Sequence, residues 1–173
     1  MSRQRLPVHD RKTRPPVGLK GVGEMKKALF VMLLAWTLAV ACRAQGQADV
    51  EREKAAIREA VLNYIEGWYE ANPARMEKAL DAELVKRYVE KSPTGKSILI
   101  SIGARAMVDY TRAGGGSKTP KEKRQIEVTI LDATGGIATA KALSADYTDY
   151  AHLAKIDGEW KIVNVLWERR HPR

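Results

Sequence analysis

Two different spacings of apolar residues divide the chain downstream of residue 49. Between residues 49 and 72 the apolar positions recur every three or four residues, which predicts an amphipathic helix. Its buried face would consist of Val50, Ile57, Val61, Tyr64, Ile65 and Trp68. Asn72 and Pro73 are typical of an N-cap and a first helical residue, and they predict a second, short helix over ARMEKAL. The following AELVKRYVE fits a helical face better than a strand, and ILISIGARAMVDYTR predicts a short extended piece leading into a helix over 104–112.

Alternating apolar and polar residues replace the helical spacing after residue 124. RQIEVTIL predicts a strand, ATGG a turn, and GIATAKALSADYTDYAHLAKI one very long extended run that must bend or contain a bulge. Asp157-Gly158 predicts a two-residue hairpin turn, and EWKIVNVLWE is its return strand. Helices followed by an antiparallel meander predict the α+β class.

Two loops contain residues that could be mistaken for binding motifs. KSPTGKS (91–97) ends like a phosphate loop, but Glu90 stands where that motif needs glycine, so a polar turn is predicted. GGGSKTPKEK (114–123) predicts a flexible, basic surface loop.

The hairpin turn also predicts a register and two sheet faces. A regular ladder pairs Ile156 with Glu159, Leu153 with Ile162 and Ala151 with Asn164. One face then carries Tyr147, Asp149, Ala151, Leu153, Trp160, Ile162, Asn164 and Leu166. Neither face is plainly polar, so we expect helices to cover one face and a second copy of the chain to cover the other, as a homodimer.

Asp149 and Asn164 become diagonal neighbours on an otherwise apolar face in this register. If helices cover that face, both lie near Tyr64 and Trp68 and could orient a small ligand in an apolar pocket. The alternative is that the two polar groups only satisfy each other or the backbone. His152 falls on the opposite face, where it is more typical of packing or an interface than of catalysis.

The charge and the N-terminal segment bear on location and partners. The net charge is +9, but residues 1–48 hold nine Lys or Arg against two acids, so the remainder carries only +2 and gives no reason to expect nucleic acid. Residues 25–48 have the pattern of a signal peptide, with Lys26 and Lys27 before a 14-residue apolar run from Ala28 to Ala41. We therefore expect residues 1–24 to be a disordered basic extension or the product of a mis-called start, and the domain, residues 49–173, to be periplasmic or secreted.

Cleavage after Ala44 or Ala48 fits this pattern. Lipidation of Cys42, the only cysteine, is the alternative and would be the only route to a membrane. The lipoprotein pattern is imperfect, because the position three residues before Cys42 is Ala39 rather than leucine.

Ligand spacing for a metal, a glycine fingerprint for a dinucleotide and a nucleophile elbow are all missing from the sequence. The sequence thus predicts no metal site and no cofactor.

Four tracts resemble the "Putative lumazine-binding" family of the nuclear-transport-factor-two-like superfamily, whose relatives include ketosteroid isomerase, scytalone dehydratase and SnoaL-like cyclases. The tracts are AIREAVLNYIEGWYEANPARMEKAL, LVKR, IEVTILDATGGIATAKA and DYAHLAKIDGEWKIVNVLWE. The resemblance implies a cone in which N-terminal helices pack in the concave face of a strongly bent antiparallel sheet, around a deep apolar pocket and often in a dimer.

Three functions remain open on these grounds. The first is a non-catalytic, exported binding domain for a small apolar or planar ligand, with a pocket lined by Tyr64, Trp68, Tyr110, Tyr147, Asp149 and Asn164. The second is an isomerase or dehydratase with Asp149 as general base and a tyrosine as electrophile. The third is a protein-interaction module whose own side chains fill the pocket.

Overall fold

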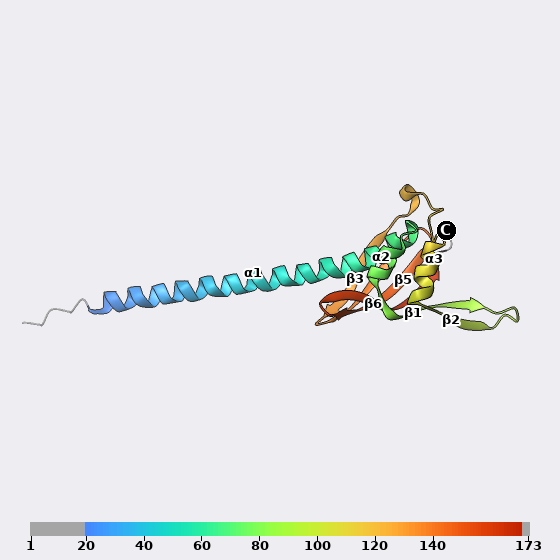
Figure 1. Ribbon diagram of the computed structural model, residues 1–173. Helices are drawn as coiled ribbons and strands as arrows, with labels where there is room; N and C mark the ends of the chain where they lie inside the picture. The colour runs from blue at the N-terminus through green and yellow to red at the C-terminus, as the bar shows by residue number, and fades with distance from the viewer. Residues whose placement is uncertain (1–19, 171–173) are drawn as a thin grey trace, which may run out of the picture. The chain divides into compact units, whose positions relative to one another are not determined.

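The computed structural model describes residues 20–170 and consists of two units, Met1–Gly46 and Gln47–Arg173. The first unit is helical over all of its described residues. Among the described residues, no helix combines the length and the hydrophobicity needed to cross a membrane. The second unit contains the sheet and the core, and the description below concerns that unit (Figure 1).

Three α-helices supply one layer of the second unit. The C-terminal part of α1 (Lys20–Tyr69) is followed by α2 (Pro73–Ala79) and, after two strands, by α3 (Ala104–Arg112). The predicted cap is confirmed, because the side chain of Asn72 accepts a hydrogen bond from the amide of Arg75 and Pro73 begins α2. Chain direction reverses between α1 and α2 through Ala71, whose φ is +52°.

Six strands form a single open sheet with the order β2-β1-β6-β5-β4-β3. The strands are β1 (Leu80–Lys91), β2 (Ser97–Gly103), β3 (Glu127–Thr134), β4 (Ile137–Leu143), β5 (Tyr147–Ile156) and β6 (Glu159–Arg169). Neighbours are antiparallel except for β1 and β6, which run parallel. The α+β class is confirmed, and the sheet is mixed because β1 inserts between β2 and β6.

The helix predicted for AELVKRYVE is wrong, because these residues belong to β1. Leu84 and Lys86 alternate as buried residues with the less buried Val85 and Arg87, which is the period of two of a strand. The four apolar residues of this segment fit both periods, and pairing with β2 and β6 on the two sides decides in favour of the strand. The predicted polar turn at 92–96 then connects β1 to β2, closed by a 2.9 Å hydrogen bond from the amide of Gly95 to the carbonyl of Ser92.

The single long run predicted over 136–156 is also wrong, since it is a hairpin of β4 and β5. The chain turns at residues 144–146, where the amide of Ser144 donates to the carbonyl of Tyr147 over 3.0 Å. The Ser-Ala-Asp sequence there is compatible with a turn but lacks the glycine that marks the other hairpins.

The register of β5 and β6 follows the prediction only near the turn. Asp157 and Gly158 both have positive φ, Ile156 pairs with Glu159 and Leu153 pairs with Ile162, as predicted. A bulge then places one extra residue, Val163, in β6, so that Ala151 pairs with Val165 instead of Asn164. Every residue of β6 beyond the bulge therefore faces the side opposite to the one predicted.

The bulge decides which residues reach the core. Val165 is buried under the helices and Trp167 is half-buried there, whereas Leu166 is exposed on the outer face. The core between the sheet and the helices includes Ile57, Val61, Tyr64, Ile65, Tyr69, Met76, Leu84, Met107, Leu153, Ile162 and Val165.

The loop predicted to be flexible, 114–123, contacts the end of α1. The amide of Gly116 donates to the carbonyl of Trp68 over 3.0 Å. A Cβ on Gly116 would lie 2.7 Å from the indole nitrogen of Trp68, so only glycine fits against that ring. The loop is thus partly a packing element, and Lys121, Glu122 and Lys123 at its end form a short exposed 3₁₀ turn.

Candidate functional site

A small cavity lies between the helices and the inner face of the sheet. Its volume is about 120 Å³, and its walls come from α1, α3, β1, β2, β5 and β6. The lining residues are Tyr64, Ile65, Trp68, Lys86, Ile102, Met107, Tyr110, Tyr147, Asp149, Trp167 and Arg169. An apolar enclosure with a few polar groups is the usual form of a small-molecule site.

Three buried polar side chains from three elements form a connected group in this wall. The ammonium of Lys86 lies 2.8 Å from Oδ1 of Asp149, and the hydroxyl of Tyr64 donates to the same oxygen over 2.7 Å. Lys86 also donates to the hydroxyl of Tyr64. The two charges neutralise each other, which is the condition under which a lysine and an aspartate can both be buried.

Burial shifts the proton affinities of this group. Desolvation lowers the pKa of Lys86, and the opposing attraction of Asp149 offsets only part of that effect. Desolvation also raises the pKa of Tyr64 well above its usual value, and the adjacent negative charge of Asp149 raises it further. Tyr64 is therefore a neutral hydroxyl over the whole physiological pH range.

Aromatic rings surround the ammonium of Lys86. Its nitrogen lies 4.6 Å from the ring centre of Trp167, 5.0 Å from that of Tyr64 and 6.0 Å from that of Tyr147. The ring of Tyr147 meets Trp167 edge-on at 5.3 Å and Trp68 at 6.3 Å. The contacts of the ammonium with Trp167 and Tyr147 add cation–π stabilisation, whereas Tyr64 is contacted through its hydroxyl. The rings also form flat walls against which a planar molecule could pack.

Three buried polar atoms of the wall have no hydrogen-bond partner among the described residues. They are Oδ2 of Asp149 and the indole Nε1 atoms of Trp68 and Trp167. All three residues line the cavity, and Asp149 and Trp167 are a cross-strand pair of β5 and β6. Oδ2 is an acceptor and the two indole N–H groups are donors, so the cavity wall contains both kinds of unused hydrogen-bonding capacity.

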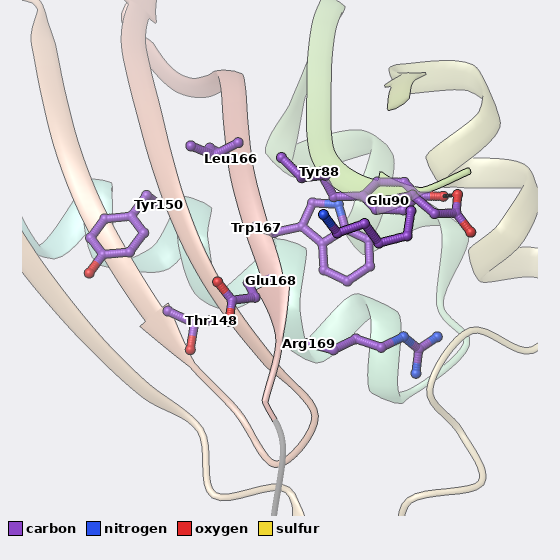
Figure 2. Close-up of a pocket in the computed structure, with 10 residues that line it drawn as sticks. Tyr88, Glu90, Thr148, Tyr150, Leu166, Trp167, Glu168 and Arg169 are labelled. Atoms are coloured by element: carbon purple, nitrogen blue, oxygen red, sulfur yellow. Dashed lines mark hydrogen bonds between the residues drawn. The ribbon is translucent and has the colours of Figure 1, made fainter. Parts of the chain in front are cut away.

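A larger open groove shares two residues with the cavity. It has a volume of about 830 Å³ and runs along the C-terminal parts of β1 and β6 and the start of β5. Figure 2 shows Trp167 beside Tyr88 and Arg169, with Thr148 and Tyr150 on β5. Trp167 and Arg169 also line the cavity, while Glu90, Lys91 and Glu168 add further charged side chains to the groove.

The structure brings together five of the six residues predicted to line a pocket. Tyr64, Trp68, Tyr110, Tyr147 and Asp149 all line the cavity. Asn164 does not, because the bulge turns it to the outer face of the sheet. There its side-chain oxygen accepts from Arg87 over 2.5 Å and its amide nitrogen lies 3.2 Å from Nδ1 of His152. The expected position of Asn164 as a diagonal neighbour of Asp149 on the same face is therefore wrong.

Sequence reasoning missed Lys86 and Trp167. Lys86 was hidden by the helical interpretation of its segment, since as a strand that segment places Lys86 between Leu84 and Tyr88 on the inner face. Trp167 was assigned to the wrong face, because an extra residue in a strand leaves no sign in a regular alternation. A lysine at an inward strand position was the one available signal for the ion pair.

Among the described residues, no group of three or more His, Cys, Asp or Glu could hold a metal.

The family model described as "Putative lumazine-binding" matches residues 52–168, which is most of the chain. The chain belongs to this family. The match includes every residue that lines the cavity except Arg169, which lies one residue beyond its end. No curated protein matches the sequence.

Solved structures with the same fold come from several bacteria. An NTF2-like protein of unknown function from Shewanella baltica is 22% identical, with a TM-score of 0.54 over 70% of this chain and 96% of its own. Another from Methylobacillus flagellatus is 18% identical, with a TM-score of 0.53 over 69% and 94%. An NTF2-like protein with a cystatin-like fold from Novosphingobium aromaticivorans is 10% identical, with a TM-score of 0.53 over 75% and 90%. These similarities concern the fold.

Proposed function

We propose that the domain binds a small molecule in the cavity beside Lys86 and Asp149 and does not convert it. The observation that carries this proposal is the aromatic-walled cavity, in which Oδ2 of Asp149 and the indole N–H groups of Trp68 and Trp167 have no hydrogen-bond partner among the described residues. Membership of the "Putative lumazine-binding" family supports it, as does the NTF2-like fold. A binding site is expected to show such a preformed apolar enclosure with a few polar groups.

The geometry argues against the isomerase or dehydratase alternative. In that mechanism a tyrosine donates a hydrogen bond to the substrate while a carboxylate removes a proton. Here the hydroxyl proton of Tyr64 is already donated to Asp149, and Oδ1 of Asp149 is occupied by two donors. Tyr64 is therefore not arranged to donate to a substrate, and Oδ2 is the only oxygen of Asp149 that remains as a possible base.

Native mass spectrometry of the full-length protein, purified gently from its own cells, tests the binding proposal. Ile102→Trp would fill the cavity from its wall without touching the polar group, and Ile137→Trp at an exposed position of β4 is the matched control. We expect a co-purifying small molecule in the wild type and in the control but not in Ile102→Trp. Protein without any bound molecule, or one retained by Ile102→Trp, would contradict the proposal.

The non-catalytic part needs a separate measurement. The released molecule is to be incubated with fresh protein and followed by NMR, because an isomerisation would leave its mass unchanged. We expect the spectrum to stay constant. A new species that forms with the wild type but not with Asp149→Asn would favour the isomerase or dehydratase instead.

We also propose that the domain is exported, on the basis of the signal-peptide pattern of residues 25–48. Mass spectrometry of the mature N-terminus of the cell-envelope fraction is the test, and cleavage after Ala44 or Ala48 is expected. A mature chain that begins with a lipid-modified Cys42 would favour the lipoprotein alternative, and an intact N-terminus in the cytoplasm would contradict export.

A further inference from the structure

Lys86 is a buried amine whose side chain forms part of the cavity wall. An ammonium has three N–H groups, and Lys86 directs two of them to the hydroxyl of Tyr64 and to Oδ1 of Asp149. The third has no hydrogen-bond acceptor among the described residues, and the ring of Trp167 lies 4.6 Å from the nitrogen. A molecule that entered the cavity could therefore reach this nitrogen without displacing either hydrogen bond.

The surroundings of Lys86 favour reaction of its amine with a carbonyl group. Only a neutral amine attacks a carbonyl carbon, and a lysine becomes easier to deprotonate when it is removed from water. Desolvation lowers the pKa of Lys86 in this way. Oδ1 of Asp149, 2.8 Å from the nitrogen, is in place to take the proton. The site thus combines a nucleophile with its proton acceptor.

The product of such a reaction preserves the charges of the site. Lys86 first gives one proton to Asp149, and its nitrogen bonds to the carbonyl carbon. A second N–H proton moves to the carbonyl oxygen, which leaves as water when Asp149 returns the first proton. Lys86 then carries an iminium with one N–H, and its positive charge still lies opposite the ionised carboxylate. The ion pair, which is the condition for burying either charge, is kept throughout.

The cavity also suits such a bond by its access and its dryness. Trp167 and Arg169 line both the cavity and the open groove, so a small molecule can enter at these two residues. Apolar and aromatic side chains form most of the remaining wall. Exclusion of water from this wall favours the iminium, because water is a product of its formation and hydrolyses it.

We infer that Lys86 holds a small aldehyde in the cavity through a reversible iminium bond, with Asp149 as proton acceptor and counter-ion. This inference rests on the proposed binding function and names its ligand class, since hydrolysis releases the same aldehyde unchanged. The rings of Trp167 and Tyr147 stabilise the iminium as they do the ammonium.

The size of the cavity restricts the aldehyde. Its volume of about 120 Å³ is close to that of an engineered cavity of about 150 Å³ that holds benzene, so one six-membered ring is the largest body that fits. An aldehyde has only hydrogen as the second substituent of its carbonyl carbon, whereas a ketone would need room for another carbon group. An aldehyde on a single planar ring is therefore the expected class.

Reductive trapping with benzaldehyde tests the inference on the full-length protein, after dialysis to remove bound small molecules. Sodium cyanoborohydride reduces an iminium to a stable secondary amine, so a lysine that has reacted is identified by peptide mass spectrometry. Lys54 and Lys78, which are exposed, are the comparison within the same chain. We expect Lys86 to be labelled at neutral pH at least about tenfold faster than either, because its amine is more easily deprotonated and the cavity holds the aldehyde beside it.

Two variants that keep Lys86 separate a reaction in the cavity from general lysine chemistry. Ile102→Trp fills the cavity, and labelling of Lys86 should fall by about tenfold or more. Ile137→Trp, at an exposed position of β4, is the matched control and should leave it unchanged. Near-UV circular dichroism establishes whether both variants keep the fold. If Ile102→Trp does not fold, the comparison of Lys86 with Lys54 and Lys78 in the wild type decides.

Failure of this inference can be distinguished from failure of the binding proposal. Labelling of Lys86 no faster than that of the exposed lysines would overturn the inference, as would undiminished labelling in a folded Ile102→Trp. If a molecule co-purifies with the protein but Lys86 is not labelled selectively, the binding proposal stands and only the iminium is overturned. If Lys86 is labelled selectively but no molecule co-purifies, the reactivity of Lys86 stands and the binding proposal is contradicted.

Discussion

At the scale of residues, Lys86 and Asp149 form a buried ion pair in the wall of the cavity. Both side chains are almost completely buried, and each is tolerated because the other supplies the opposite charge. Such a pair adds little net stability compared with an apolar pair of the same volume. Its presence inside an otherwise apolar wall therefore suggests a role in the site rather than in stability.

Lys86→Met leaves the carboxylate of Asp149 buried without a counter-charge. We expect it to lower the free energy of unfolding by about 3–5 kcal/mol, measured by urea titration. Adding Asp149→Leu in the same chain should restore much of that loss. The control Lys78→Met, which removes an exposed pair with Glu59, should change stability by less than about 1 kcal/mol. A double variant that is no more stable than Lys86→Met would contradict the charge explanation.

The raised pKa of Tyr69 predicts that the protein loses stability at alkaline pH. Burial raises the pKa of its hydroxyl to about 12, and hydrogen bonding to Ser144 opposes this while Asp146 adds to it. Between pH 10 and 12 the native state keeps this proton and the unfolded chain loses it, so stability falls as pH rises. We expect the free energy of unfolding to drop between pH 9.5 and 11.5 by about 1 kcal/mol more in the wild type than in Tyr69→Phe. Titration of Lys86 changes the stability of the wild type and of Tyr69→Phe by the same amount, so it cancels in the comparison. If the free energy of unfolding fell equally with pH in the two proteins, the assignment to Tyr69 would be contradicted.

At the scale of elements, the bulge in β6 determines which side chains enter the cavity. If Val163 were paired in a regular ladder instead of bulged, Val165 and Trp167 would face outward, and Asn164 and Leu166 would enter the core. Parallel pairing of β6 with β1 also depends on which face each residue of β6 takes after the bulge, because Lys86 lies beside Val165. One residue thus sets both the core and the ligand-facing wall.

Deletion of Val163 should accordingly leave the fold intact, because Asn164 then follows Ile162 in a regular ladder and Val165 still faces the helices. Deletion of Val165 should be far more damaging, because the bulge stays and Leu166 turns inward while Trp167 turns outward, and we expect the domain to lose several kcal/mol or to fail to fold. Val165→Ala, which shortens the same side chain without changing the register, is the control and should retain the fold. Circular dichroism with thermal unfolding measures all three variants, and equal melting temperatures for the two deletions would contradict the role of the bulge.

At the scale of the whole molecule, the outer face of the sheet remains the proposed dimer surface. Tyr150 and Leu166 are a cross-strand pair on this face, and their exposed fractions are 44% and 51%. Arg87, Asn164 and His152 form a polar row across the same face. An exposed apolar patch with a polar row is typical of an interface between subunits.

Leu166→Glu should separate such a dimer into monomers. A charge at the centre of the face would be buried without a partner on association, and we expect the dimer dissociation constant to rise at least 100-fold in sedimentation equilibrium. Leu131→Glu, at an equally exposed site on the edge strand β3, is the control and should remain dimeric. A wild-type protein that is monomeric at high concentration would contradict the dimer itself.

The sequence by itself determined the α+β class, the helical cap at Asn72, the hairpin turn at Asp157-Gly158 and four of the five aromatic residues of the cavity wall. Each of these follows from local signals: apolar spacing, side-chain capping and the need for positive φ. Only the tertiary structure decided that residues 80–91 form a strand, since pairing with two neighbours outweighs an ambiguous local pattern. It also decided the ion pair of Lys86 with Asp149 and the exclusion of Asn164 from the cavity. Those two features depend on strand order and on one bulged residue, which are set by packing between segments far apart in the sequence.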